Sequence, residues 1–176
     1  MQLQGERVAL RHLVADEAPA LLAFMKENRA FLERWEPVRE PGFFTLDAQV
    51  ADIEASAADA AADRRHAFGI FLDSELVGRI ALSQIFRGIF QNAYLGYSIG
   101  EPWNGRGLAT EAVGVAMRFA FDDLALHRVQ AAVMPRNIAS IRVLEKNGFR
   151  EEGYAVAYLC INGVWEDHRI FARTRD

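Results

Sequence analysis

The sequence predicts a mixed α/β fold (α+β in type), with strands and amphipathic helices in a single domain spanning residues 1–176. Three observations lead to this prediction. Apolar residues after Asp16 recur at a spacing near 3.6, which is typical of a helix. A glycine-containing turn at 104–107 separates an apolar stretch from a second helical pattern. Near the end of the chain, Asn162-Gly163 lies between two β-forming stretches, and this pair favours the type I′ turn of a hairpin.

About seven strands and about four helices are expected along the chain. The strands should span 7–13, 66–72, 76–84, 91–99, 128–134, 154–161 and 164–171, most of them antiparallel. The helices should span 16–32, 45–62, 109–124 and 138–147. Asn137 is the expected N-cap of the last helix and Gly148 its C-terminal stop. Pro135 should end the strand before it, because proline has no N–H to donate.

The composition narrows the function without naming it. Hydrophobic residues make up 51% and charged residues 25%, as in a folded globular protein. A formal charge of −4 argues against a nucleic-acid partner. The single cysteine, Cys160, cannot form an intramolecular disulfide, and His66, His127 and His168 lack metal-ligand spacing, so we expect no metal. We expect a cytoplasmic protein, because we see neither a signal peptide nor a run of about 18 apolar residues.

The stretch from Trp103 to Glu111 is the most informative part of the chain. Two glycines and Arg106 lie where a strand gives way to a helix, whose first N–H groups lack internal partners. Such a helix start can bind a phosphate or diphosphate. The same stretch is also consistent with a simple tight turn that leaves Arg106 in solvent. An NTPase phosphate loop would require Gly-Lys-Ser/Thr, and a dinucleotide fold would require a third glycine where Thr110 stands.

Several motifs resemble those of the GCN5-related N-acetyltransferase (GNAT) superfamily, and the similarity covers nearly the whole chain. The segment 104–109, Asn-Gly-Arg-Gly-Leu-Ala, is similar to the family's acetyl-CoA loop and departs from it only at Asn104. Asn137-x-x-Ser140 and the segment 144–149 resemble the second acetyl-CoA segment. The segment 158–168, together with Phe-Leu-x-x-Trp-x-Pro at 31–37, is similar to the Rim-type ribosomal-protein-alanine N-acetyltransferases.

The resemblance implies a GNAT fold, whose sheet splays apart between its fourth and fifth strands to admit acetyl-CoA as co-substrate. The pantetheine arm would pair with the backbone of Tyr97 to Ile99, and Asn137 would steady it from the opposite wall. Glu111 is expected to face solvent or Arg106, away from the diphosphate. The diphosphate would lie on the backbone N–H groups of Gly105, Arg106, Gly107, Leu108, Ala109 and Thr110.

The resemblance also implies direct attack of a primary amine on the thioester within a ternary complex. A backbone N–H near Ile99 would polarise the carbonyl. Many relatives carry a tyrosine that reprotonates the leaving thiolate, but this chain has Leu144 at that position. Ser140 is therefore the candidate for this acid, directly or through a water. Asp167 and His168 are the candidates for the base, although each could instead hold the hairpin or position substrate. A covalent route through Cys160 is disfavoured, because a mid-strand cysteine without a base is usually inert packing.

The absence of a clear strong base among the candidates also favours one kind of acceptor amine. Deprotonation at pH 7 costs about 1 kcal/mol for an α-amine and about 4.6 kcal/mol for lysine, which favours a protein N-terminus, such as that of a ribosomal protein. A small amine, a non-catalytic acetyl-CoA-binding module and a homodimer remain open alternatives. Several aromatic residues lie in segments that surround the acceptor cleft in this family, although aromatic residues more often belong to the core. They are Trp35, Phe43, Phe44, Phe86 and Phe90.

Overall fold

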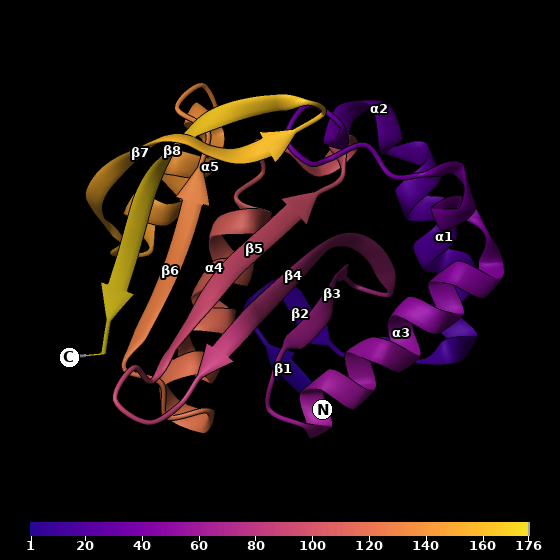
Figure 1. Cartoon of the computed structure of the whole chain (residues 1–176). Helices are drawn as coiled ribbons and strands as arrows, with labels where there is room; N and C mark the ends of the chain where they lie inside the picture. The colour runs from indigo at the N-terminus through magenta and orange to yellow at the C-terminus, as the bar shows by residue number, and fades with distance from the viewer. Residues whose placement is uncertain (176) are drawn as a thin grey trace.

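The computed structural model describes residues 1–175, whose strands form one eight-stranded sheet in the order β1-β2-β3-β4-β5-β6-β8-β7 (Figure 1). The strands are β1 (Gln2–Gln4), β2 (Val8–Arg11), β3 (His66–Leu72), β4 (Glu75–Phe86), β5 (Asn92–Ile99), β6 (Arg128–Val133), β7 (Arg150–Ile161) and β8 (Val164–Thr174). The helices are α1 (Ala18–Glu27), α2 (Arg29–Leu32), α3 (Leu46–Ala61), α4 (Leu108–Arg118) and α5 (Ile138–Lys146).

All seven expected strands are present, and β1 is an additional short one. The helix expected at 16–32 is divided at Asn28, whose buried side-chain amide donates to the carbonyl of Phe24. The helix expected at 109–124 ends its α-helical part at Arg118 and continues as a π-helical turn over Phe119–Asp123. Thr45 caps α3 through its side chain. The division at Asn28 and the cap at Thr45 each depend on an individual hydrogen bond, which apolar periodicity does not report.

The sheet consists of two antiparallel halves joined by one short parallel contact. β5 and β6 pair in parallel at only three positions, from Asn92 opposite Arg128 to Tyr94 opposite Gln130. Beyond Tyr94, β5 continues beside β4, whereas β6 continues beside β8. The predicted splay between the fourth and fifth expected strands is therefore confirmed at β5 and β6, which separate towards the carboxyl end of β5 (Figure 1).

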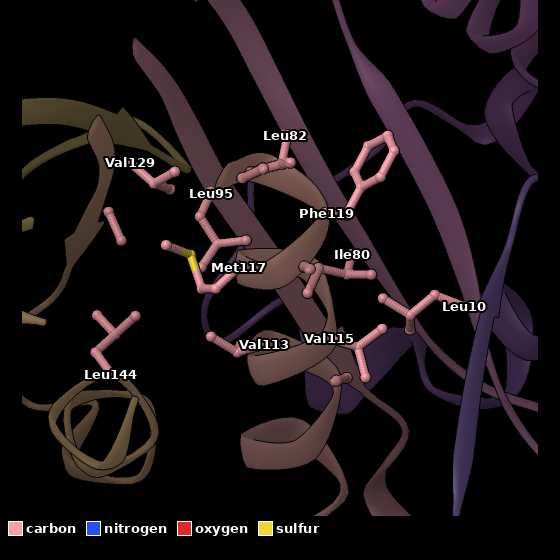
Figure 2. Close-up of a cluster of buried hydrophobic side chains, with 14 of the residues drawn as sticks. Leu10, Ile80, Leu82, Leu95, Val113, Val115, Met117, Phe119, Val129 and Leu144 are labelled. Carbon is pink, nitrogen blue, oxygen red and sulfur yellow. The ribbon is translucent and has the colours of Figure 1, made fainter. Parts of the chain in front are cut away.

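Two hydrophobic clusters support the sheet. The larger one packs α4 and α5 against the strands, and its members include Val113, Met117 and Leu144 on the helices and Leu82 and Leu95 on the strands (Figure 2). The smaller one packs α1 and α3 against the sheet. Helix α4 is amphipathic and closely packed, so the position of its first turn is fixed by the core beneath it. No helix within residues 1–175 is both long and apolar enough to cross a membrane.

Candidate active site

The turn between β5 and α4 has the geometry expected of a helix start that is open to a ligand. Gly105 and Gly107 have φ values of 74° and 78°, a region that glycine adopts without strain. Gly107 is the N-cap of α4, and no atom lies within 4 Å of where a Cβ on Gly105 would be. Leu108 is buried, so it can offer a ligand only its backbone. The turn thus brings the backbone of residues 105–110 to one end of β5.

Asn104, at the position where the loop motif departs from the family pattern, closes this turn. Its side-chain amide donates to the carbonyl oxygens of Ile99 and Gly100, at 3.1 and 2.9 Å. The side-chain oxygen of Asn28 accepts from the backbone N–H of Glu101 at 2.7 Å, which ties the end of α1 to the same turn. Sequence reasoning missed both roles. The departure at Asn104 was a signal that could have pointed to its role, whereas Asn28 is distant in sequence from the turn.

Next to the turn, β5 presents an open backbone edge. Among the described residues, the pairing of β5 with β6 stops at Tyr94, so the outer edge of Leu95 to Ile99 faces the slot between the two strands. The side chain of Ile99 is buried and its carbonyl oxygen accepts from Asn104, which leaves its N–H as the backbone group able to meet a ligand. Such an edge can pair with an extended amide-containing molecule.

Tyr97 and Ser140 join β5 to α5 beside this slot. The Tyr97 hydroxyl lies 2.8 Å from Ser140 Oγ and donates to the Ser140 carbonyl at 3.1 Å. Burial raises the pKa of Tyr97 to about 12, although the hydrogen bond to Ser140 opposes the rise, so the phenol keeps its proton at neutral pH. Asn137 Oδ1 accepts from the backbone N–H of Ser140, which confirms its role as N-cap of α5. Leu144 is fully buried and carries no acid group into the slot.

Asp167 and His168 have different surroundings on β8. Both Asp167 oxygens are engaged within the hairpin, by the Tyr154 hydroxyl and the Ala157 backbone N–H, each at 2.8 Å. Hydrogen bonds from Ala157 and then Tyr154 lower the pKa of Asp167, which makes it a weaker base. His168 is buried, and its Nδ1 lies 3.0 Å from the Glu166 carbonyl oxygen. That contact places a proton on Nδ1, so in the neutral ring Nε2 is the acceptor nitrogen.

Two sequence-based expectations need correction. Cys160 is exposed on β7 rather than packed in the interior, because β7 is the edge strand of the sheet and nearly all of it is exposed. Glu111 does not face solvent or the Arg106 side chain. It accepts hydrogen bonds from the backbone N–H groups of Arg7 and Val8 and pairs with the Arg7 guanidinium. Long-range contacts of this kind leave no local pattern in the sequence.

The aromatic residues expected around the acceptor do not gather in one place. Phe43 and Phe44 pack against the cluster of α1 and α3. Phe86 and Phe90 are exposed beside the connection between β4 and β5, at the opposite end of β5 from Ile99. Trp35 belongs to the segment that follows α2.

The hairpin tip contacts the segment after α2. Asn162 Oδ1 accepts from the Val38 backbone N–H at 2.6 Å, and its amide donates to the Glu33 carbonyl at 3.3 Å. A surface hollow beside this contact is lined by Met25, Arg29, Leu32, Glu33, Glu36, Pro37, Arg39 and Phe44.

The open turn, the splayed strands and the succession of elements have a counterpart among known families. The family model described as an acetyltransferase (GNAT) domain matches residues 7–150. This chain belongs to the GNAT family of acetyltransferases. The matched region contains the turn and all of α5, and the chain is an N-acetyltransferase.

Similar GNAT proteins include ribosomal-protein acetyltransferases. The chain is 41% identical to the probable N-acetyltransferase YjcK of Bacillus subtilis, over 97% of this chain and 95% of that protein. It is 36% identical to the Escherichia coli [ribosomal protein uS5]-alanine N-acetyltransferase, over 99% and 91% of the two chains. Mycobacterium smegmatis RimJ, solved in complex with CoA-disulfide, has a TM-score of 0.94 and 30% identity, covering 99% of this chain and 87% of that one.

Proposed function

We propose that this GNAT enzyme binds acetyl-CoA in the slot between β5 and β6 and acetylates the N-terminal α-amine of a protein, with a ribosomal protein as the acceptor. The observation that carries this proposal is the open backbone edge of Leu95 to Ile99, which leads directly to the glycine turn. The E. coli relative acts on an alanine of ribosomal protein uS5, which supports the choice of acceptor. The M. smegmatis neighbour holds a CoA derivative, which supports the choice of donor.

The residues present fit acetyl-CoA. Two left-handed glycines and the free N–H groups of the first turn of α4 suit a diphosphate, from Gly105 to Thr110 with Arg106 beside them. The backbone of Tyr97 to Ile99 suits the amides of a pantetheine arm, and we retain Asn137 as the residue on the opposite wall. When bound, acetyl-CoA would supply an acetyl thioester at the end of β5 near Ile99.

Ser140 is proposed as the acid, with Tyr97 as its partner. In the overall reaction a C–N bond forms, the C–S bond breaks, and the thiolate that leaves needs a proton. The Ser140 hydroxyl can give that proton to the thiolate as it takes up the proton of the Tyr97 phenol, which is still protonated at neutral pH, and the phenolate then regains a proton from solvent. The N-cap bond from Ser140 to Asn137 fixes the backbone at this position.

His168 is proposed as the group that takes the proton of the attacking amine, directly or through water. Its Nδ1 contact with the Glu166 carbonyl oxygen fixes the ring and leaves the lone pair of Nε2 to accept a proton. Asp167 is the less suitable of the two candidates, because both of its oxygens are already engaged. A single histidine is a modest base, which matches an α-amine better than a lysine amine.

An acceptor assay tests the proposal. A peptide beginning with alanine is compared with the same peptide carrying a blocked α-amine and an internal lysine, and with a small polyamine. CoA release and product mass are followed. We expect the free N-terminus to react at least about tenfold faster, in line with the difference in deprotonation cost. Preference for the blocked peptide or for the polyamine would contradict the acceptor. CoA binding without release of thiol from any amine would identify a non-catalytic binding module.

A further inference from the structure

Arg7 and Glu111 form a hydrogen-bonded unit that connects the start of β2 to the first turn of α4. The two residues are 104 positions apart in sequence. Glu111 Oε1 accepts from the backbone N–H groups of Arg7 and Val8, at 2.6 and 3.0 Å. Arg7 Nε donates to Glu111 Oε2 at 3.0 Å, and the Glu111 side chain is only 15% exposed.

The same guanidinium group reaches the glycine turn. Arg7 Nη1 donates to the carbonyl oxygen of Arg106 at 3.0 Å. Arg7 Nη2 lies 3.4 Å from where a Cβ on Gly107 would be, so the guanidinium lies close against the N-cap of α4. One side chain therefore contacts both the acidic residue in the first turn of α4 and the peptide that precedes it.

This contact sets the direction of a peptide group within the turn. In a trans peptide the C=O and the following N–H point in opposite directions. Because the Arg106 carbonyl points towards Arg7, the N–H of Gly107 points away from it. The carbonyl dipole, which would repel an anion, is thus directed to the Arg7 side of the turn.

Glu111 would otherwise oppose an anion at this helix start. Burial alone would raise the pKa of Glu111, but hydrogen bonds from the backbone of Arg7 and Val8 and from the Arg7 side chain lower it overall. Glu111 is therefore ionised at neutral pH, and its negative charge lies in the first turn of α4. The positive charge of Arg7 offsets it locally.

We propose that Arg7 is a positioning residue for the diphosphate site, which orients the Arg106–Gly107 peptide and offsets the charge of Glu111. This role rests on the proposed use of acetyl-CoA. Arg7 acts through the backbone of the turn, so its removal should weaken interactions with the diphosphate and leave those with the pantetheine arm unchanged.

The test uses Arg7→Gln, which removes the charge and the two-pronged contact, and Arg7→Lys, which keeps the charge. Arg64→Gln is the matched control, because it breaks a comparable ion pair between Arg64, which follows α3, and Asp59 in the last turn of α3. Calorimetry gives the Kd for CoA. Steady-state kinetics give kcat and KM for acetyl-CoA and for S-acetylpantetheine, which lacks the diphosphate. Thermal unfolding gives Tm for each variant.

For Arg7→Gln we expect the Kd for CoA and the KM for acetyl-CoA to rise about tenfold, with kcat and the KM for S-acetylpantetheine within about twofold. The Kd and KM values of Arg7→Lys should lie between those of Arg7→Gln and the unchanged protein, and those of Arg64→Gln should match the unchanged protein. In a Glu111→Gln background the loss caused by Arg7→Gln should be smaller, because there is no charge left to offset.

Equal CoA binding by Arg7→Gln and the unchanged protein would overturn the role of Arg7. Equal loss of acetyl-CoA and S-acetylpantetheine would also overturn it, because that pattern reports general distortion. If Arg7→Gln unfolds at the assay temperature, Arg7→Lys and Glu111→Gln carry the same comparison. Failure of the unchanged protein to bind CoA would instead overturn the proposed function.

Discussion

The hydroxyl groups of Tyr97 and Ser140 lie 2.8 Å apart, and they link β5 to the first turn of α5 beyond the point where β5 and β6 separate. Tyr97 comes from the half-sheet that precedes the glycine turn, whereas Ser140 comes from the segment after β6. The two sides of the slot are thus held at a fixed separation by side chains that can also exchange a proton.

Removal of the Ser140 hydroxyl should slow the reaction. We expect Ser140→Ala to lower kcat about 100-fold and Tyr97→Phe about tenfold, with smaller changes in the KM for acetyl-CoA. The double variant should be no slower than Ser140→Ala, because the two hydroxyls act together. Steady-state kinetics provide the measurement, and Tyr94→Phe on the same strand is the control. An unchanged kcat for Ser140→Ala would remove it as the acid.

Substitutions of Asp167 and His168 should affect different measured quantities, Tm for Asp167 and kcat for His168. His168→Gln should lower kcat at neutral pH by at least about tenfold, because it removes the proposed proton acceptor. Asp167→Asn should mainly lower Tm, because the hairpin loses charge-assisted bonds to Ala157 and Tyr154. Parallel measurement of kcat and Tm distinguishes the two. The reverse pattern, with Asp167→Asn inactive but stable, would assign the base to Asp167.

Glu111 should make the stability depend on acidity. Its pKa in the folded state is lowered, so its stabilisation is present above the unfolded pKa near 4.5 and is lost as the pH falls through the folded value. Glu111→Gln should therefore cost about 1–3 kcal/mol at pH 7 and less at pH 3. Urea unfolding at both pH values measures this, with exposed Glu54→Gln as control. A cost that does not change with pH would contradict the assignment.

Cys160 should prove dispensable for catalysis. Its side chain is exposed on the edge strand, and a direct-attack mechanism does not use it. We expect Cys160→Ala to keep kcat within about twofold of the unchanged protein, in the range of surface substitutions. The thiol should react readily with an alkylating reagent, after which activity should persist. Loss of activity in a folded Cys160→Ala variant would revive the covalent route.

Asn162 should influence acceptor binding without touching the donor. It has a φ of 54° in the hairpin turn, and its side chain contacts Val38 and Glu33. Asn162→Gly keeps the turn and removes these contacts, whereas Asn162→Ala also strains the turn. We expect both to raise the KM for the peptide severalfold, and only Asn162→Ala to lower Tm by several degrees. An unchanged peptide KM in both variants would separate this contact from the acceptor site.

Local patterns predicted the fold well. The Asn162-Gly163 pair, the alternation in the strands and the two glycines of the turn act through nearest neighbours, so the seven strands and the glycine turn could be placed from them. The short strand β1 was missed, because three residues are too few to establish an alternation. The break of the first helix was missed because it depends on the single side chain of Asn28, which bonds the Phe24 carbonyl and also accepts from Glu101, a residue 73 positions away.

The site was predictable only in part. Residues 105–110 and Asn137 lie where the motifs indicated, although their contact with a ligand stays a prediction. The partnership of Tyr97 with Ser140 could not be read from the sequence, since it arises where two strands diverge in three dimensions. The role of Arg7 was hidden for the same reason, because its partners Arg106 and Glu111 lie about a hundred residues away.

The three-residue parallel contact at Asn92 to Tyr94 is the pairing that joins the two antiparallel halves of the sheet. An extended molecule that pairs with the free edge of Leu95 to Ile99 would extend the pairing beyond Tyr94 and couple the two half-sheets. Amide hydrogens in β5 should then exchange far more slowly with deuterium, and thermal unfolding should shift upward with ligand concentration. Acetyl-CoA would in this way act as an additional strand of the sheet, present only while it is bound to the enzyme.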